Sequence, residues 1–68
     1  MEKVRFLVFR DYGDRQIACA EFREEEDARE YYRWQKSRWD AETDSFVWKL
    51  CRCTDYVGTS FTMESLEG

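Results

Sequence analysis

Histidine and proline are absent from this sequence, and glycine occurs only three times in 68 residues. Without histidine the commonest general base is missing, and a cysteine nucleophile would lack its usual partner. The three glycines are isolated from one another, so they form no glycine-rich loop of the kind that holds phosphate groups. We therefore expect a protein that is not an enzyme and that uses no cofactor.

Cysteine is also sparse, with Cys19, Cys51 and Cys53 as its three occurrences. Cys51 and Cys53 stand two apart in a predicted strand, where they point the same way and are poorly placed to bridge each other. Three thiols without histidine do not match a usual zinc site, and the calcium-loop-like segment 40–44 lacks the glycine and the later glutamate of a calcium loop. We expect no metal site and reduced thiols in apolar roles. A disulfide between Cys19 and either Cys51 or Cys53 stays an alternative.

Long hydrophobic runs are missing as well. The apolar part of residues 1–14 is too short and too charged for a signal peptide or a membrane span, which favours a cytoplasmic protein without membrane contact. Eleven basic and fifteen acidic residues give a net charge of −4, which disfavours non-specific binding to nucleic acid. A small nucleic-acid-binding regulator stays an alternative, because four arginines could gather on strand surfaces: Arg5, Arg10, Arg15 and Arg52.

Aromatic residues, in contrast, are abundant at 18 % of the chain, and the stretch 21–39 combines several of them with a dense acidic run. Residues 24–39 are predicted to form one amphipathic helix, acidic at its start and basic at its end, as the helix dipole favours. Trp34 lies on the flank of its apolar stripe beside Arg38, where it either wraps the edge of the core or anchors a partner. The stripe itself consists of Ala28, Tyr31, Tyr32, Gln35 and Trp39.

Alternating apolar residues predict strands at 3–10, 15–22 and 46–53, and a weaker fourth strand at 57–63. Residues 1–68 are thus expected to form a single domain of the α+β class. Its helix packs on a three- or four-stranded antiparallel sheet with strand order 2-1-3-4. Residues 54–56 are expected to form a turn and residues 64–68 to fray. In the second strand, Ala18, Ala20 and Phe22 are expected to point to the same face of the sheet.

A single helix can cover only one face of such a sheet. The other face would expose apolar residues, and monomers rarely leave a large apolar patch in water. A domain of 68 residues is also marginally stable alone. These two constraints predict a homodimer, or a partner protein on the uncovered face.

The order of a hairpin, the helical stretch FREEEDAREYYRWQKSRW and the strand FVWKLCRC resembles that of short phage and mobile-element proteins. It is similar to the small bacteriophage inhibitors of bacterial RNA polymerase, which share the strand–helix–strand order, and to phage inhibitors of bacterial immunity nucleases. The resemblance is architectural, spans residues 15–53 and transfers no individual site residue. It implies a binding protein of β-β-α-β type that occupies a host enzyme, such as RNA polymerase or a CRISPR-type nuclease, in the host cytoplasm.

These observations lead to the hypothesis of a non-catalytic protein-interaction module that blocks a host enzyme by steric and electrostatic occlusion. Carboxylates spaced along a surface can imitate phosphates and enter a basic nucleic-acid channel. A structural or assembly protein whose function is its own homodimer is a further alternative. The residues predicted to contact the partner are exposed aromatic, basic and acidic ones: Tyr12, Glu25, Glu26, Trp34, Arg38, Asp40, Glu42 and Asp44.

Overall fold

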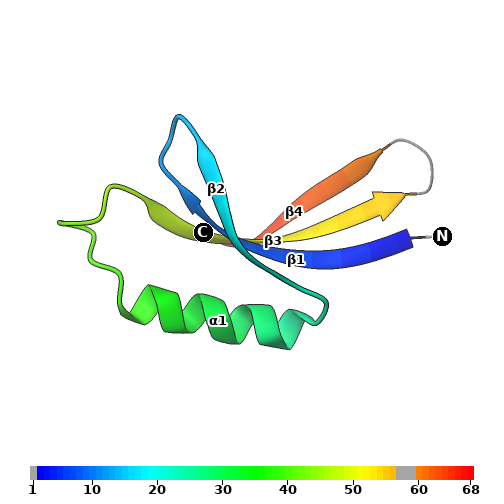
Figure 1. Cartoon of the computed structure of the whole chain (residues 1–68), viewed down its shortest axis with the longest axis horizontal. Helices are drawn as coiled ribbons and strands as arrows, with labels where there is room; N and C mark the ends of the chain where they lie inside the picture. Colours follow the sequence, from blue (N-terminus) through cyan, green and yellow to red (C-terminus); the bar gives the residue numbers. More distant parts are fainter. Residues whose placement is uncertain (1, 57–59) are drawn as a thin grey trace.

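The fold is one layer of strands with a helix on one side (Figure 1). The computed structural model describes residues 2–56 and 60–68. The elements in these residues are β1 (Glu2–Asp11), β2 (Gln16–Phe22), α1 (Glu25–Ser37), β3 (Val47–Tyr56) and β4 (Phe61–Glu67). The sheet has the order β2-β1-β3-β4, and every neighbouring pair is antiparallel. The predicted α+β class and strand order are therefore confirmed.

The centre of the sheet is formed by β1 and β3. They pair without interruption from Glu2 opposite Tyr56 to Asp11 opposite Val47. Both strands carry apolar side chains on both faces, which is typical of central strands and favours burial along their length. This long pairing sets the end of β1 directly beside the start of β3.

A tight turn at residues 12–15 connects β1 to β2. Gly13 has φ +93°, in the left-handed region that glycine adopts without steric cost. Its N–H donates to Oδ1 of Asp11 at 2.8 Å, and the N–H of Tyr12 donates to the carbonyl of Arg15 at 2.9 Å. These bonds fix the position of Tyr12 at the tip of the hairpin.

The core lies between α1 and one face of the sheet. Ala28 is fully buried and lets the helix approach the strands closely, and the Tyr32 hydroxyl donates to the carbonyl of Trp48 at 3.5 Å. The predicted aromatic stripe of the helix is therefore the stripe that faces the core. Buried members of this core are Phe6, Val8, Ala28, Tyr32, Trp48 and Leu50, with Phe22, Tyr31, Trp39, Phe46 and Leu66 packed around them.

The last strand differs from its prediction. Residues 54–56, predicted as a turn, continue β3, and residues 64–67, predicted to fray, belong to β4. Of the predicted strand 57–63, residues 57–59 lie outside the described part of the chain. Two ion pairs hold the end of β4 in place: Arg52 contacts Glu64 at 2.7 Å and Arg29 contacts Glu67 at 2.9 Å. Acidic residues that suggest a solvated tail thus have partners in β3 and α1.

A β-bulge changes the faces of β2. Val8 pairs with Ala20, but the next residue, Phe9, pairs with Ala18, so Cys19 has no partner opposite it. The prediction that Ala18, Ala20 and Phe22 share one face is wrong, because the extra residue turns Ala18 to the face opposite Ala20. Cys19 is exposed and, like the buried Cys51 and Cys53, it is a free thiol, so the alternative of a disulfide is not realised.

The helix starts one residue later and ends two residues earlier than predicted, and its N-cap residue Glu24 makes no side-chain cap hydrogen bond. An ion-pair cluster stabilises this end instead. The Glu25 carboxylate contacts Arg29 at 2.8 Å within the helix and Arg52 of β3 at 3.2 Å. These hydrogen bonds, first from Arg29 and then from Arg52, lower the pKa of Glu25.

We expect Glu25→Gln to lower the melting temperature at pH 7 by a few degrees, because two arginines lose a charged partner. The native pKa of Glu25 lies below its unfolded value of about 4.3. Its stabilising contribution is therefore complete above that value and disappears as the pH falls through the lower native pKa. The difference in melting temperature from wild type, followed by circular dichroism, should shrink in acid.

The matched control is Glu26→Gln, because Glu26 is the exposed neighbour of Glu25. It removes the same charge and should leave the melting temperature nearly unchanged. A difference between wild type and Glu25→Gln that stays the same from neutral to strongly acidic pH would contradict the role of the ion-pair cluster.

Candidate functional site

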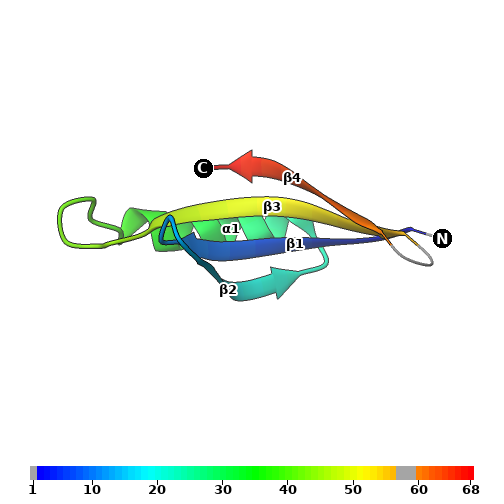
Figure 2. The same ribbon diagram turned by 90° about the horizontal axis from the view of Figure 1, so that it is seen from above.

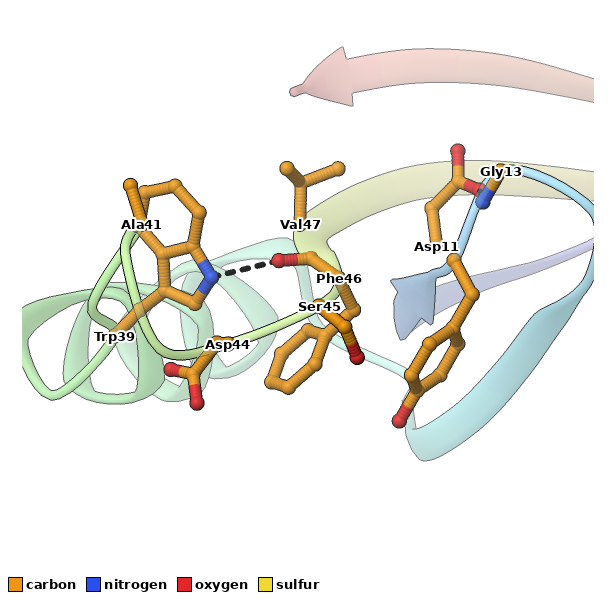
Figure 3. A pocket seen from close by; sticks show the side chains of 9 residues that line it. Asp11, Gly13, Trp39, Ala41, Asp44, Ser45, Phe46 and Val47 are labelled. Atoms are coloured by element: carbon orange, nitrogen blue, oxygen red, sulfur yellow. Dashed lines mark hydrogen bonds between the residues drawn. The ribbon is translucent and has the colours of Figure 1, made fainter.

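The turn of the hairpin and the segment that follows the helix meet at one end of the molecule, drawn at the left of Figure 1. They enclose an open pocket of about 510 Å³, which Figure 3 shows from close by. The pairing of Asp11 with Val47 brings these two segments together. We call this the acidic pocket; its lining is Asp11, Tyr12, Gly13, Trp39, Ala41, Asp44, Ser45, Phe46 and Val47.

Three aromatic side chains give the acidic pocket its shape. The indole Nε1–H of Trp39 donates to the carbonyl of Phe46 at 2.7 Å, which closes the loop between them (Figure 3). The Phe46 ring lies 5.4 Å from the Tyr12 ring and 5.4 Å from the Trp48 ring, measured between centroids. Such distances are typical of favourable aromatic pairs. A row of rings therefore runs from the hairpin tip into the core.

The loop of residues 40–45 is organised by its own carboxylates. The Asp40 N–H donates to Oδ2 of Asp44 at 3.0 Å, and the Glu42 N–H donates to Oδ1 of Asp40 at 2.9 Å. The Asp44 N–H also donates to the Asp40 carbonyl at 2.9 Å. Side-chain bonds of this kind are typical of tight turns. They leave acceptor capacity on both aspartates, and no described cation forms an ion pair with Asp40, Glu42 or Asp44.

Asp11, the other carboxylate of the acidic pocket, is already neutralised. Its side chain contacts Nζ of Lys49 at 2.8 Å and accepts the Gly13 N–H. The hydrogen bond from Lys49, followed by that from Gly13, lowers the pKa of Asp11, and Asp11 in turn raises the pKa of Lys49. The uncompensated negative charge at the acidic pocket thus belongs to Asp44 and its loop.

A second hollow of about 400 Å³ lies on the other side of Trp39, Asp44 and Phe46, and it contains arginine. The Arg10 guanidinium carbon lies 4.6 Å from the centroid of the Phe46 ring and 5.1 Å from that of Trp48. Its Nε is buried and has no hydrogen-bond partner among the described residues. We call this the arginine pocket, which is lined by Arg10, Gln35, Arg38, Trp39, Asp44, Phe46 and Trp48.

Five of the eight predicted contact residues fall in this region. Tyr12 and Asp44 line the acidic pocket, and Asp40 and Glu42 belong to the loop that forms its wall. Arg38 lines the arginine pocket instead. Most of the predicted contact residues therefore lie together at this end of the molecule.

Trp34, Glu25 and Glu26 lie elsewhere. The Trp34 side chain is 55 % exposed on the helix flank, with the Arg38 guanidinium carbon 4.7 Å from its ring centroid. Glu25 and Glu26 start the helix, roughly 15–20 Å along its axis from the loop at its other end. Glu25 is also occupied by two arginines, so it serves the fold.

Of the nine residues that line the acidic pocket, sequence reasoning named only Tyr12 and Asp44 as contact residues. Trp39 and Phe46 sit at helical and strand spacings that predict core residues, and Asp11 directly follows the predicted strand 3–10. The predicted strand order indicates which residues should form the pocket. If the first and third strands pair antiparallel, the end of the first must lie beside the start of the third, so that residues 11–13 and 44–47 meet.

No protein-family model, curated protein or solved structure matches this chain. The described part of the chain has no helix that is long and apolar enough to cross a membrane. Residues 2–56 and 60–68 also bring together no group of three side chains that could hold a metal ion. The function must be inferred from the geometry of the site.

We expect Trp39→Phe to lower the free energy of unfolding by about 1 kcal/mol, the typical net contribution of one hydrogen bond. The substitution keeps an aromatic ring but removes the indole N–H that holds the Phe46 carbonyl. Trp34→Phe is the matched control, since the same change at an exposed indole should cost less than about 0.5 kcal/mol. Urea unfolding followed by circular dichroism measures both values; equal losses would show that the indole bond does not hold the loop.

Proposed function

We propose that this protein is a non-catalytic protein-interaction module that binds a basic segment of another protein in the acidic pocket. One observation carries the proposal. The aromatic rings of Tyr12, Trp39 and Phe46 line an open pocket whose remaining charged side chain, Asp44, belongs to a loop of carboxylates without ion pairs among the described residues.

An arginine or lysine side chain has the chemistry that this pocket lacks. Its charge would pair with Asp44, and its cationic head or apolar stem would pack against the ring faces. No basic residue lines the acidic pocket, although Arg10 and Arg38 stand on the other side of the same wall. A partner segment that carries a basic residue beside an acidic one would match both hollows.

The charges of the strands support a protein partner over nucleic acid. Arg5 contacts Glu21 at 2.8 Å and Asp55 at 3.1 Å. Arg52 contacts Glu64 at 2.7 Å and Glu25 at 3.2 Å. Two of the four arginines on which the alternative of a nucleic-acid-binding regulator rests are thus each shared by two carboxylates and have little charge left for phosphates, which makes this alternative the weaker one.

The partner that fits an acidic module is an enzyme whose basic channel holds nucleic acid. Such channels present lysine and arginine to phosphates, and a compact domain with a net charge of −4 can occupy them. The resemblance in element order to phage inhibitors of RNA polymerase and of immunity nucleases agrees with this proposal. The mechanism is competition, in which carboxylates take the place of the phosphates of the nucleic acid.

A short peptide with one central arginine and blocked termini tests the pocket directly. In NMR spectra of the labelled full chain, we expect it to shift the indole N–H signal of Trp39 more than that of Trp34. Added salt should weaken the binding, because exposed charges are screened. The same peptide with citrulline, which is neutral, is the control for charge and should bind much less. Equal shifts with both peptides would contradict recognition of a cation.

The proposed inhibition is tested with purified bacterial RNA polymerase and a CRISPR-type nuclease. We expect the chain to inhibit one of them and to compete with its nucleic acid. The triple change D40N/E42Q/D44N should weaken inhibition at least tenfold, since it removes the loop charges but keeps the acceptor oxygens that bond Asp40 and Glu42 N–H groups. A control variant with the same loss of charge at exposed residues elsewhere, E2Q/E24Q/E30Q, should inhibit like wild type. An equal loss of inhibition in both variants would contradict a role of the loop carboxylates in inhibition.

A further inference from the structure

No described helix or loop packs on the face of the sheet opposite α1, although the outer strands β2 and β4 curl towards this side (Figure 1) and Phe9, Cys51 and Cys53 on it are buried. Figure 2 looks onto this face, with the helix behind the central strands. Two large apolar side chains of β4 are exposed, Phe61 at 60 % and Met63 at 49 %. Their partners in β3 are Asp55 and Cys53, which places both side chains on the face away from the helix. We call this surface the open face.

A groove of about 180 Å³ crosses the open face and is mainly apolar. The small side chain of Ala18, which the bulge places opposite Phe9, leaves this space unfilled. The lining residues come from β1, β2 and β4, and they are Leu7, Phe9, Gln16, Ala18 and Met63. The open face thus has both an exposed ring and a hollow to receive one.

The charges of the open face cancel within the face. Arg5 is paired with Glu21 and Asp55, and Lys49 is paired with Asp11. Lys3, opposite Asp55 in the register, adds the last cation of the described strand residues on this face. Three cations therefore face three carboxylates, although the whole chain carries a net charge of −4. The surplus negative charge lies elsewhere, on the helix side and in the loops.

A second copy of this chain is the partner that such a surface fits. A strongly basic or acidic partner would find no net charge to match, whereas two neutral open faces can meet without like-charge repulsion. The loop of the acidic pocket, in contrast, would repel a copy of itself. We propose that the open face is the interface of a homodimer in which Phe61 of each subunit occupies the groove of the other.

The positions of the ring and the groove agree with a two-fold axis. Phe61 pairs with Asp55, which also pairs with Lys3 of β1, so Phe61 is level with Lys3. The wall of the groove that β1 and β2 form lies farther along the sheet, at Phe9 and Ala18. Six residues of strand, roughly 20 Å, separate the two levels. A two-fold axis that lies parallel to the open face, between the two copies and midway between ring and groove, exchanges them, so that ring and groove meet twice, as a closed isologous contact requires.

Sedimentation of the full chain across the micromolar range tests the dimer. We expect a monomer–dimer equilibrium in wild type, and an increase of the dimer dissociation constant by at least about 30-fold in Phe61→Asp, as for a central interface anchor. Met63→Lys is a second variant at the edge of the groove and should act in the same direction. Trp34→Ala removes a similarly exposed aromatic ring from the helix flank and should leave the dimer intact.

Photo-crosslinking locates the contact. A benzophenone amino acid at position 61 should crosslink between subunits to peptides that contain residues 7–9 or 16–18. A wild-type monomer at all concentrations, an unaffected dimer in both open-face variants, or crosslinks confined to other regions would overturn the proposal. Phe61 does not line the acidic pocket, so failure of this test is distinct from failure of peptide binding.

Discussion

The antiparallel pairing of β1 with β3 is the constraint on which the rest of the structure depends. These strands are distant in sequence, and their uninterrupted register aligns Phe6 and Val8 with Leu50 and Trp48 into the surface that receives the helix. The same register ends with Asp11 beside Val47, where the hairpin turn meets the segment that leaves the helix. Core and pocket are therefore two consequences of one alignment, and a slip by one residue would turn the core side chains to the open face.

The elements of this fold could be predicted where hydrophobic periodicity dominates. The aromatic stripe of α1 has a strong apolar period, and the apolar residues on both faces of β1 and β3 are typical of central strands; these predictions are confirmed. The bulge at Cys19 could not be predicted in this way. The residues around it, Ala18 to Ala20, are so small that either face accommodates them at similar free energy, and the choice depends on their neighbours in the folded sheet. The extent of β4 likewise depends on arginines in β3 and α1 that are distant in sequence.

The candidate site shows the same limit for charged and aromatic residues. A place in turns could be predicted for Tyr12 and Asp44, but both are half-buried, and their convergence on one pocket required the strand pairing. The spacings of Trp39 and Phe46 predict core residues, yet a half-buried ring can pack in the core with one face and line a pocket with the other. Glu25 is the reverse case, a predicted contact residue that serves the fold. A carboxylate at the start of a helix predicts a solvated surface, but the folded sheet places Arg52 beside it.

The acidic pocket and the open face are adjoining surfaces, and this has a thermodynamic consequence for the two proposals. Asp11 and Val47 line the pocket and also belong to the end of the open face. The Lys49 that neutralises Asp11 is part of the charge balance of that face. Binding at one surface that moved these side chains would change the free energy of binding at the other, and such coupling is reciprocal. The proposed homodimer and the proposed capture of a partner would therefore share a boundary, which consists of the Asp11–Lys49 ion pair and the side chain of Val47.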